Sequence, residues 1–216
     1  MISNNLKKRI STSLVLILLI YLIFTYKVFL VFTLLIFSIL SVIEFLNITK
    51  KIFKSIFYIT ITNFFFIIYI FIFSFTFFYF SHFFQLKLIL FVFLFGCIAS
   101  DVGGLIFGKL LKGPKLTKLS PNKTISGAVG SIVLTTLVIS IFYFYFTNNF
   151  SFLVLILGFF TSLFCQLGDL FFSFLKRKAK LKDTGNFLPG HGGILDRLDG
   201  ILLGIPISFI TLSILY

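Results

Sequence analysis

The sequence predicts an all-α protein, a polytopic bundle of about seven transmembrane helices whose N-terminus lies in the cytoplasm. Three observations support this fold class. Of the 216 residues, 59% are hydrophobic and only 12% are charged, whereas about a quarter are charged in soluble domains. Apolar runs of about 20 residues recur along the chain, and a helix of that length crosses the hydrocarbon core of a bilayer. Lysine and arginine gather in alternate connections, as expected when the cytoplasmic loops hold the positive charge.

Seven apolar segments are expected to be the spans, within a range of about six to eight. They cover residues 12–25, 28–47, 55–79, 88–107, 125–146, 152–172 and 194–215. The first follows the basic cluster Lys7-Lys8-Arg9 and is not followed by a small-residue cleavage site. We therefore expect a retained span rather than a signal peptide. Only Tyr26 and Lys27 separate the first two segments, which form either a tight hairpin or one long broken helix. The third is long enough to tilt or break.

The basic residues orient the bundle. With a cytoplasmic N-terminus, only Lys27 and Lys87 of the 19 lysines and arginines lie outside. The others fall in residues 7–9, 48–54, 108–123 and 173–197. The net charge of +13 then faces the cytoplasm, where it attracts anionic lipids. We expect a protein integral to the cytoplasmic (inner) membrane, with membrane lipids and not nucleic acid as partners.

Motif content divides the chain into two regions. Residues 1–87 are N-terminal spans with few polar motifs, whereas residues 88–216 contain cytoplasmic loops 108–123 and 173–193 and are expected to be the catalytic region. Cys97 and Cys165 lie in apolar segments without other His or Cys at ligand spacing, so we expect both thiols to fill space.

The six acidic residues are all expected at cytoplasmic helix ends or in cytoplasmic loops. They are Glu44, Asp101, Asp169, Asp183, Asp196 and Asp199. Carboxylates gathered without one-to-one cation partners repel one another unless a metal joins them. Such a set suits Mg²⁺, which takes one or two carboxylates together with phosphate and water. The alternative, that each acid pairs with a nearby Lys or Arg, fits Glu44 and Asp183 better than Asp169 and Asp196.

The block from Ser173 to Asp199 contains most of the ionisable chemistry. Asp196 and Asp199 are three residues apart, so on a helix they share a face, and they open that helix where its dipole favours anions. Gly192 and Gly193 just before them permit close approach and offer exposed N–H groups to a phosphate. His191 either acts as a general base or phosphate donor, or caps the turn.

A second polar block covers residues 100–127. Gly103, Gly104 and Gly108 thin a helix, which favours close helix packing or ligand entry. Lys123 and Thr124 precede the next span and form another candidate anion site. Two basic, glycine-rich blocks beside membrane-edge carboxylates indicate a phosphate-rich soluble ligand that meets a lipid head group.

These residues resemble a known family, the phosphatidate cytidylyltransferases or CDP-diacylglycerol synthases of bacterial type. The resemblance rests on Ser173-x-x-Lys176-Arg177, Lys182-Asp183-x-Gly185 and Pro189-Gly-His-Gly-Gly-x-x-Asp196-Arg197-x-Asp199, supported by Gly168-Asp169-Leu170 and by residues 120–127. It covers roughly residues 98–205. The chain departs from the family pattern at Ser126 and Phe172, where a glutamate is usual, and at Gly200, where serine is common.

The resemblance implies a reaction in phospholipid biosynthesis, in which CTP and phosphatidate give CDP-diacylglycerol and pyrophosphate. It also implies Mg²⁺, a second cation (K⁺ or another Mg²⁺) and a homodimer. Asp169 and Asp196 match the family's metal ligands, and we add Asp199. Further catalytic candidates are Lys176, Arg177, Lys182, Asp183, His191 and Arg197. Substrate-binding candidates are Asp101, Lys109, Ser120, Lys123, Thr124, Gly192 and Gly193.

Three other interpretations remain from the residues. A CTP-dependent lipid kinase, of polyprenol or phytol type, also joins a membrane fold to a nucleotide site, but the long signature favours nucleotidyl transfer. A cation-coupled transporter would place its acids near the bilayer midplane, whereas here they cluster at one surface. A lipid-binding scaffold does not account for the His-Gly-Gly-x-x-Asp-Arg spacing.

Overall fold

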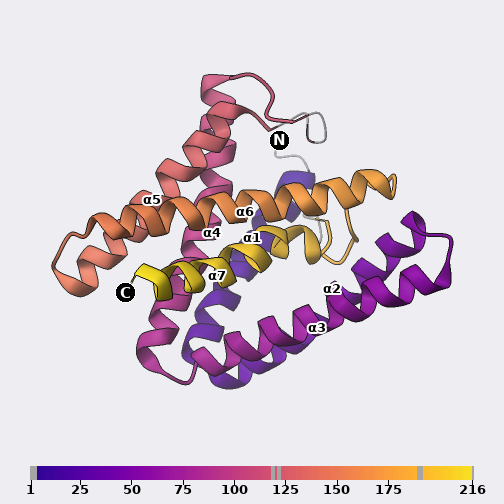
Figure 1. Cartoon of the computed structure of the whole chain (residues 1–216), viewed down its shortest axis with the longest axis horizontal. Helices are drawn as coiled ribbons and strands as arrows, with labels where there is room; N and C mark the ends of the chain where they lie inside the picture. The colour runs from indigo at the N-terminus through magenta and orange to yellow at the C-terminus, as the bar shows by residue number, and fades with distance from the viewer. Residues whose placement is uncertain (1–3, 118–119, 121–122, 189–191, 216) are drawn as a thin grey trace. The chain divides into compact units, whose positions relative to one another are not determined.

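The computed structural model describes residues 4–117, 120, 123–188 and 192–215, with side chains from residue 11 onward. Within these residues the chain forms seven helices and no sheet (Figure 1). They are α1 (Asn4–Thr25), α2 (Lys27–Ile52), α3 (Ile56–Phe80), α4 (Phe84–Leu111), α5 (Ile125–Thr147), α6 (Phe152–Lys178) and α7 (Leu195–Leu215). Each helix contains one of the apolar segments, so the all-α prediction is confirmed.

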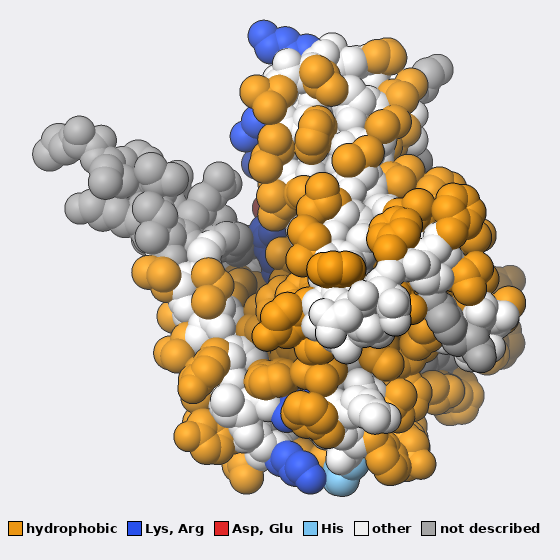
Figure 2. All heavy atoms as spheres, turned by 90° about the vertical axis from the view of Figure 1, so that its left-hand side faces the viewer, with side chains coloured by type: hydrophobic (Ala, Val, Ile, Leu, Met, Phe, Trp, Pro, Cys, Tyr) orange, Lys and Arg blue, Asp and Glu red, His pale blue; other side chains and the backbone are white. Residues whose placement is uncertain are grey.

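Six of the described helices, α2 to α7, are long and apolar enough to cross a membrane, and α1 adds a shorter apolar stretch, Ser11–Thr25. A helix satisfies its own backbone hydrogen bonds, which makes it one of the few structures that hydrocarbon tolerates. Figure 2 shows one face of the molecule covered mainly by hydrophobic side chains, with Lys and Arg in a few small groups. The protein is therefore an integral membrane protein.

Several helices run beyond the apolar segments that predict them. The helix α4 begins four residues earlier and ends four later than residues 88–107, and α6 continues through Lys176, Arg177 and Lys178. Lysine and arginine are good helix formers, and cations are favourable at a helix C-terminus. Tyr26 is extended and separates α1 from α2, whereas α3 is one unbroken helix.

The chain forms two compact units, of which the first contains Met1–Tyr79 and Leu175–Leu198. In this unit α2 and α3 lie side by side (Figure 1). The rings of Phe45 and Phe66 stack with centroids 3.9 Å apart. Further along the same pair, the Asn63 amide donates to Thr49 Oγ1 at 2.7 Å. Aromatic stacking and interhelical hydrogen bonds thus join the two helices, as is common where lipid removes the hydrophobic driving force.

The second unit contains Phe80–Phe174 and Asp199–Tyr216. Its helices α4 and α5 are in backbone contact, because a Cβ on Gly103 would lie 2.6 Å from the Gly130 carbonyl oxygen. Beside that contact, Ser131 Oγ donates to the Ser100 carbonyl at 2.6 Å. The prediction that these glycines allow close helix packing is confirmed. Cys97 and Cys165 are free and buried, in agreement with a space-filling role.

Candidate functional site

The signature block begins where α6 ends. Lys180 adopts a left-handed conformation with φ 57°. The N–H of Leu181 donates to the Lys176 carbonyl at 2.8 Å, and the N–H of Lys180 donates to the Arg177 carbonyl at 3.0 Å. These two bonds form a Schellman motif, which satisfies carbonyls that the end of a helix would leave open. The loop that follows therefore leaves α6 in a defined direction.

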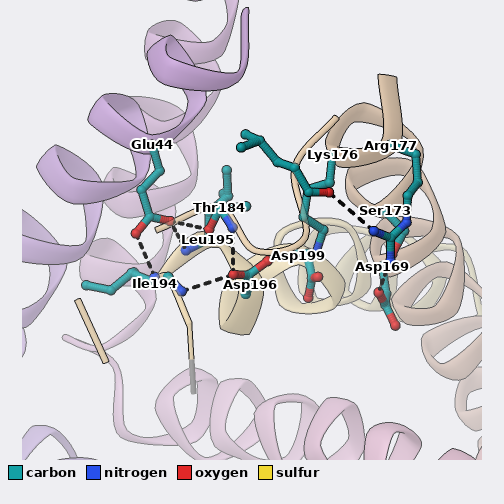
Figure 3. Close-up of polar contacts among 12 residues, drawn as sticks. Glu44, Asp169, Ser173, Lys176, Arg177, Thr184, Ile194, Leu195, Asp196 and Asp199 are labelled. Carbon is teal, nitrogen blue, oxygen red and sulfur yellow. Dashed lines mark hydrogen bonds and ion pairs between the residues drawn. The ribbon is translucent and has the colours of Figure 1, made fainter. Parts of the chain in front are cut away.

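Asp196 lies in the first turn of α7 with both carboxylate oxygens engaged. Oδ1 accepts from Lys176 Nζ at 2.6 Å, and the two side chains are only 7% and 12% exposed. Oδ2 accepts from the backbone N–H groups of Thr184 and Gly193 at 2.9 and 3.0 Å (Figure 3). One carboxylate thus ties together the end of α6, the loop and the start of α7 within the first unit.

A second carboxylate, which the sequence prediction did not place in the site, lies behind the same turn. Glu44 is 1% exposed and accepts from Thr184 Oγ1 at 2.6 Å and from the N–H groups of Ile194 and Leu195 at 3.0 and 2.9 Å (Figure 3). The only sequence signal is an acid inside an apolar span, which is costly and hence functional by default. Pairing with a Lys or Arg was the alternative for Glu44. Its contacts in the described part of the chain are instead neutral hydroxyl and N–H donors.

The second unit contains the other lysine–aspartate ion pair. Asp169 of α6 forms an ion pair with Lys123, and each side chain is 27% exposed. Ser173 Oγ donates to Asp169 Oδ1 at 3.3 Å. A Cβ on Gly168 would overlap the carbonyl oxygen of Asp199, so this part of α6 lies directly against the start of α7.

These ion pairs overturn one expectation. Asp169 and Asp196 were predicted to lack one-to-one cation partners, but each is paired with a lysine. The partners come from sequence positions 46 and 20 residues away, so local spacing does not reveal them. Each lysine balances the charge of its own aspartate, whereas the prediction had assigned that role to a metal ion.

The loop between α4 and α5 is built around Thr124. Its Oγ1 accepts from the N–H of Gly127 at 3.1 Å, which caps α5. An isolated bridge joins Lys115 to Thr124, and the Lys123 N–H donates to the Ser120 carbonyl at 3.0 Å. The loop therefore holds Lys123 at the base of α5, where its side chain reaches Asp169. The Thr124 hydroxyl is occupied as a cap, so its predicted binding role competes with a structural one.

The remaining predicted residues are mostly exposed. Asp101 and Lys109 lie exposed on α4, and Lys182, Asp183 and Arg197 are exposed in or next to the loop. Arg177 is also exposed, and its Nη1 donates to the Leu181 carbonyl at 3.3 Å. Asp199 is 7% exposed, and its Oδ1 accepts from the N–H of Gly200 at 2.9 Å. His191 lies outside the described residues.

The two glycines of the turn have different roles. Gly192 has φ 87°, a conformation that glycine adopts without steric cost. Gly193 was predicted to offer an exposed N–H group to a phosphate, and this is wrong, because that N–H donates to Asp196 Oδ2. With Ile194 and Leu195 bound to Glu44, carboxylates occupy three consecutive N–H groups at the start of α7. An anion at this end must be bound mainly by side chains.

The donor chemistry of the two aspartates suits Mg²⁺ unequally. Among the described residues no three His, Cys, Asp or Glu side chains are close enough to form a metal cage, and Mg²⁺ commonly needs only one or two carboxylates with phosphate and water. Asp169 fits well, because it is partly exposed and has one ion pair and one long hydrogen bond. Asp196 accepts three hydrogen bonds, which leaves about one of its four lone-pair positions.

The positions that depart from the signature have structural partners. Ser126 Oγ accepts from the N–H of Gly113 at 3.2 Å and lies 3.1 Å from Thr124 Oγ1. Phe172 is buried in α6 with 4% exposure. Neither residue offers a carboxylate in place of the usual glutamate, so neither adds an acid to Glu44, Asp169 and Asp196 described above.

Fold and site together define a class, an α-helical membrane protein with lysine–aspartate pairs and exposed cations at helix ends. The sequence model of the cytidylyltransferase family matches residues 7–215, and the chain belongs to this family.

Among the similar proteins are three named phosphatidate cytidylyltransferase. The one from Helicobacter pylori (strain ATCC 700392 / 26695) is 45% identical over 107 residues, which are 50% of this chain and 40% of that protein. The one from Rickettsia bellii is 42% identical over 130 residues, 55% of each. The one from Bacillus subtilis is 41% identical over 125 residues, 56% and 46%. The chain spans about half the length of the curated relatives it matches.

Proposed function

We propose that this protein transfers the cytidylyl group of CTP to phosphatidate and so forms CDP-diacylglycerol and pyrophosphate. The observation that carries the proposal is the family match over residues 7–215, to which relatives named phosphatidate cytidylyltransferase add support. The site agrees with this chemistry, because its lysines and arginines lie beside carboxylates at the ends of membrane helices.

In the proposed reaction a phosphatidate oxygen forms a bond to the α-phosphorus of CTP. The bond from that phosphorus to the bridging oxygen breaks, and pyrophosphate leaves with the electron pair. A phosphomonoester is already nucleophilic, so the protein mainly has to position two polyanions and stabilise charge on the leaving group. The exposed side chains of Arg177, Lys182 and Arg197 are proposed to neutralise the phosphates. Lys109 in the last turn of α4 is proposed to bind them together with Ser120, Lys123 and Thr124 of the α4–α5 loop.

Asp169 and Asp196 are proposed to hold Mg²⁺, with Asp199 and Asp183 close by or on a second cation. When bound, Mg²⁺ polarises the α-phosphorus and offsets the charge of the pyrophosphate. Lys123 and Lys176 form ion pairs with these carboxylates, and both ammonium groups are proposed to contact phosphate oxygens of the substrates. Asp101, His191 and Gly192 complete the proposed substrate-binding set.

The proposed setting is the cytoplasmic face of the inner membrane. Helices long enough to span the bilayer would keep the acyl chains in the membrane while the head group reaches the basic loops. The concentration of lysine and arginine in those loops supports a cytoplasmic position for them. A homodimer is proposed from the family resemblance.

The test uses the purified protein in lipid vesicles with phosphatidate, Mg²⁺ and CTP labelled in either the α- or the γ-phosphate. Cytidylyl transfer puts the α-label into lipid and the γ-label into pyrophosphate. A lipid kinase would instead put the γ-label into lipid and release CDP, and this outcome would contradict the proposal.

The metal ligands are tested in the same assay with Asp169→Asn and Asp196→Asn. Each is expected to lower product formation by orders of magnitude while the protein still folds and inserts. Lys27→Met serves as the control, because Lys27 is the first residue of α2 and belongs to neither of the two lysine–aspartate pairs. Near-normal rates in either asparagine variant would refute the ligand assignment.

A further inference from the structure

The N-terminus of α7 has no capping side chain of its own. The Ile194 carbonyl accepts from the N–H of Leu198 at 3.1 Å, so Ile194 occupies the capping position, where serine, threonine, aspartate or asparagine is usual. An isoleucine side chain cannot accept a hydrogen bond. Independently of that cap, the N–H groups of Ile194 and Leu195 stand at the very start of the helix, where no intrahelical carbonyl accepts from them, and both residues are buried.

Glu44 supplies the missing acceptors from another helix. Its Oε1 accepts from Ile194, and its Oε2 accepts from both Leu195 and the Thr184 hydroxyl. Because the carboxylate is 1% exposed, it is far from bulk water and does not offer a surface for substrate. Its function has to be exerted through the turn that it holds.

The same carboxylate explains two glycines. A Cβ on Gly185 would lie 2.5 Å from Glu44 Oε1 and 3.0 Å from its Cδ, and the three nearest heavy atoms to that Cβ would all belong to Glu44. A Cβ on Gly193 would overlap Thr184 Oγ1 and the Glu44 carboxylate. The end of a flexible side chain normally moves aside, but this one is fixed by three hydrogen bonds. At positions 185 and 193 the backbone can therefore approach the Glu44 carboxylate this closely only because both residues are glycine.

Thr184 connects Glu44 to Asp196. Its hydroxyl donates to Glu44 at 2.6 Å, while its N–H donates to Asp196 Oδ2 at 2.9 Å. On the other side of the turn, Gly193 donates to the same Oδ2 and is followed by the two residues that Glu44 binds. Both backbone donors that orient Asp196 are thus adjacent to, or part of, residues that Glu44 fixes.

We propose that Glu44 is a positioning residue that holds Thr184 and residues 193–195 of the turn in place and thereby fixes the orientation of the Asp196 carboxylate. Its effect on turnover rests on the proposed cytidylyl transfer. Its effect on the turn does not depend on that function and is measured separately.

The experiment compares Glu44→Gln with wild type by hydrogen–deuterium exchange and by cytidylyl transfer. Glutamine keeps the size but replaces one carboxylate oxygen by an NH₂ donor, so one of the two oxygen positions that accept from Ile194 and Leu195 no longer offers an acceptor. Amide exchange at Thr184 and residues 193–195 is expected to rise at least tenfold, with α4 and α5 unchanged. Turnover is expected to fall at least tenfold, together with a higher Mg²⁺ concentration for half-maximal rate. Ser41→Ala is the matched control, because Ser41 is buried in the same helix and its hydroxyl has no hydrogen-bond partner among the described residues.

A double-mutant cycle with Gly185→Ala keeps the proposal testable if Glu44→Gln folds poorly. Gly185→Ala should reduce turnover in the wild-type background, because the new methyl group displaces the carboxylate. In the Glu44→Ala background the same change should reduce turnover by less than twofold. Additive effects in the cycle would overturn the proposal.

Two further outcomes distinguish failure of the positioning role from failure of the proposed function. If exchange rises in Glu44→Gln but turnover and Mg²⁺ dependence stay as in wild type, Glu44 is only a helix cap and the positioning role is refuted. If the wild-type protein transfers no cytidylyl group, the proposed function fails, and the exchange measurement alone decides whether Glu44 holds the turn.

Discussion

Replacing Lys176 by methionine measures how much its buried ion pair with Asp196 contributes to folding. Methionine keeps much of the aliphatic stem but leaves a carboxylate that is 7% exposed without its cation. Removing one partner of a buried pair typically costs about 3–5 kcal/mol. Asp196 keeps two backbone N–H donors, so we expect the lower end, about 3 kcal/mol. That loss corresponds to a factor of roughly 150 in the folding equilibrium.

The matched comparison is Lys123→Met, which removes the other ion pair. Lys123 and Asp169 are each 27% exposed, and partly hydrated pairs of this kind contribute at most about 1 kcal/mol. Equilibrium unfolding in mixed detergent micelles, followed by circular dichroism, compares both variants with wild type. Equal destabilisation by the two changes, or a Lys176→Met variant within about 0.5 kcal/mol of wild type, is inconsistent with the buried pair.

Three other predictions concern packing and capping. Gly103→Ala should destabilise the protein by about 1–3 kcal/mol, because its Cβ would lie 2.6 Å from a backbone oxygen of α5. Gly104→Ala should destabilise the protein less than Gly103→Ala, since the nearest neighbour of its Cβ would be a serine hydroxyl. Thermal unfolding in detergent measures both variants, and a larger loss of stability in Gly104→Ala would contradict the close helix contact at Gly103. Thr124→Ala should cost about 1 kcal/mol through loss of the α5 cap, with Thr124→Ser near wild type in the same measurement. Cys97 and Cys165 should react with a maleimide only after denaturation, because both thiols are 1% exposed; rapid labelling of the folded protein, read by mass spectrometry, would show that they are accessible.

The helices were predictable from sequence because the apolar runs in α2 to α7 are each long enough to form a span, and the shorter run in α1 still predicts a helix. The observed α3 and α5, at Ile56–Phe80 and Ile125–Thr147, differ from the predicted segments by a residue or less at each end. The ends of α4 and α6 were less predictable, since helix formation continues beyond the apolar run into polar residues. Hydropathy indicates where a segment is buried in lipid, and it does not indicate where the backbone stops coiling.

The site was only partly predictable, and the difference lies in sequence separation. The local motif pointed to the turn at Gly192 and to Asp196, and in the structure Gly192 has a positive φ and Asp196 accepts three hydrogen bonds. The contacts of Glu44 with the turn cross about 150 positions, and the contact of Lys123 with Asp169 also joins distant segments. One sequence contains no information that pairs such residues. The prediction of a free N–H at Gly193 was wrong for a different reason, because its acceptor Asp196 is only three residues away and the bond depends on how the turn folds.

The separation between Glu44 and its donors also bears on how the chain matures. The helix α2 is synthesised and inserted well before residues 184–195 leave the ribosome, so the Glu44 carboxylate must wait in or near the bilayer for its three partners. An ionised group without partners is unstable in hydrocarbon. Synthesis of the C-terminal segment therefore supplies the hydrogen-bond donors that Glu44 lacks until then. Nascent chains that stop before α7 should accordingly be retained poorly by the membrane or be degraded.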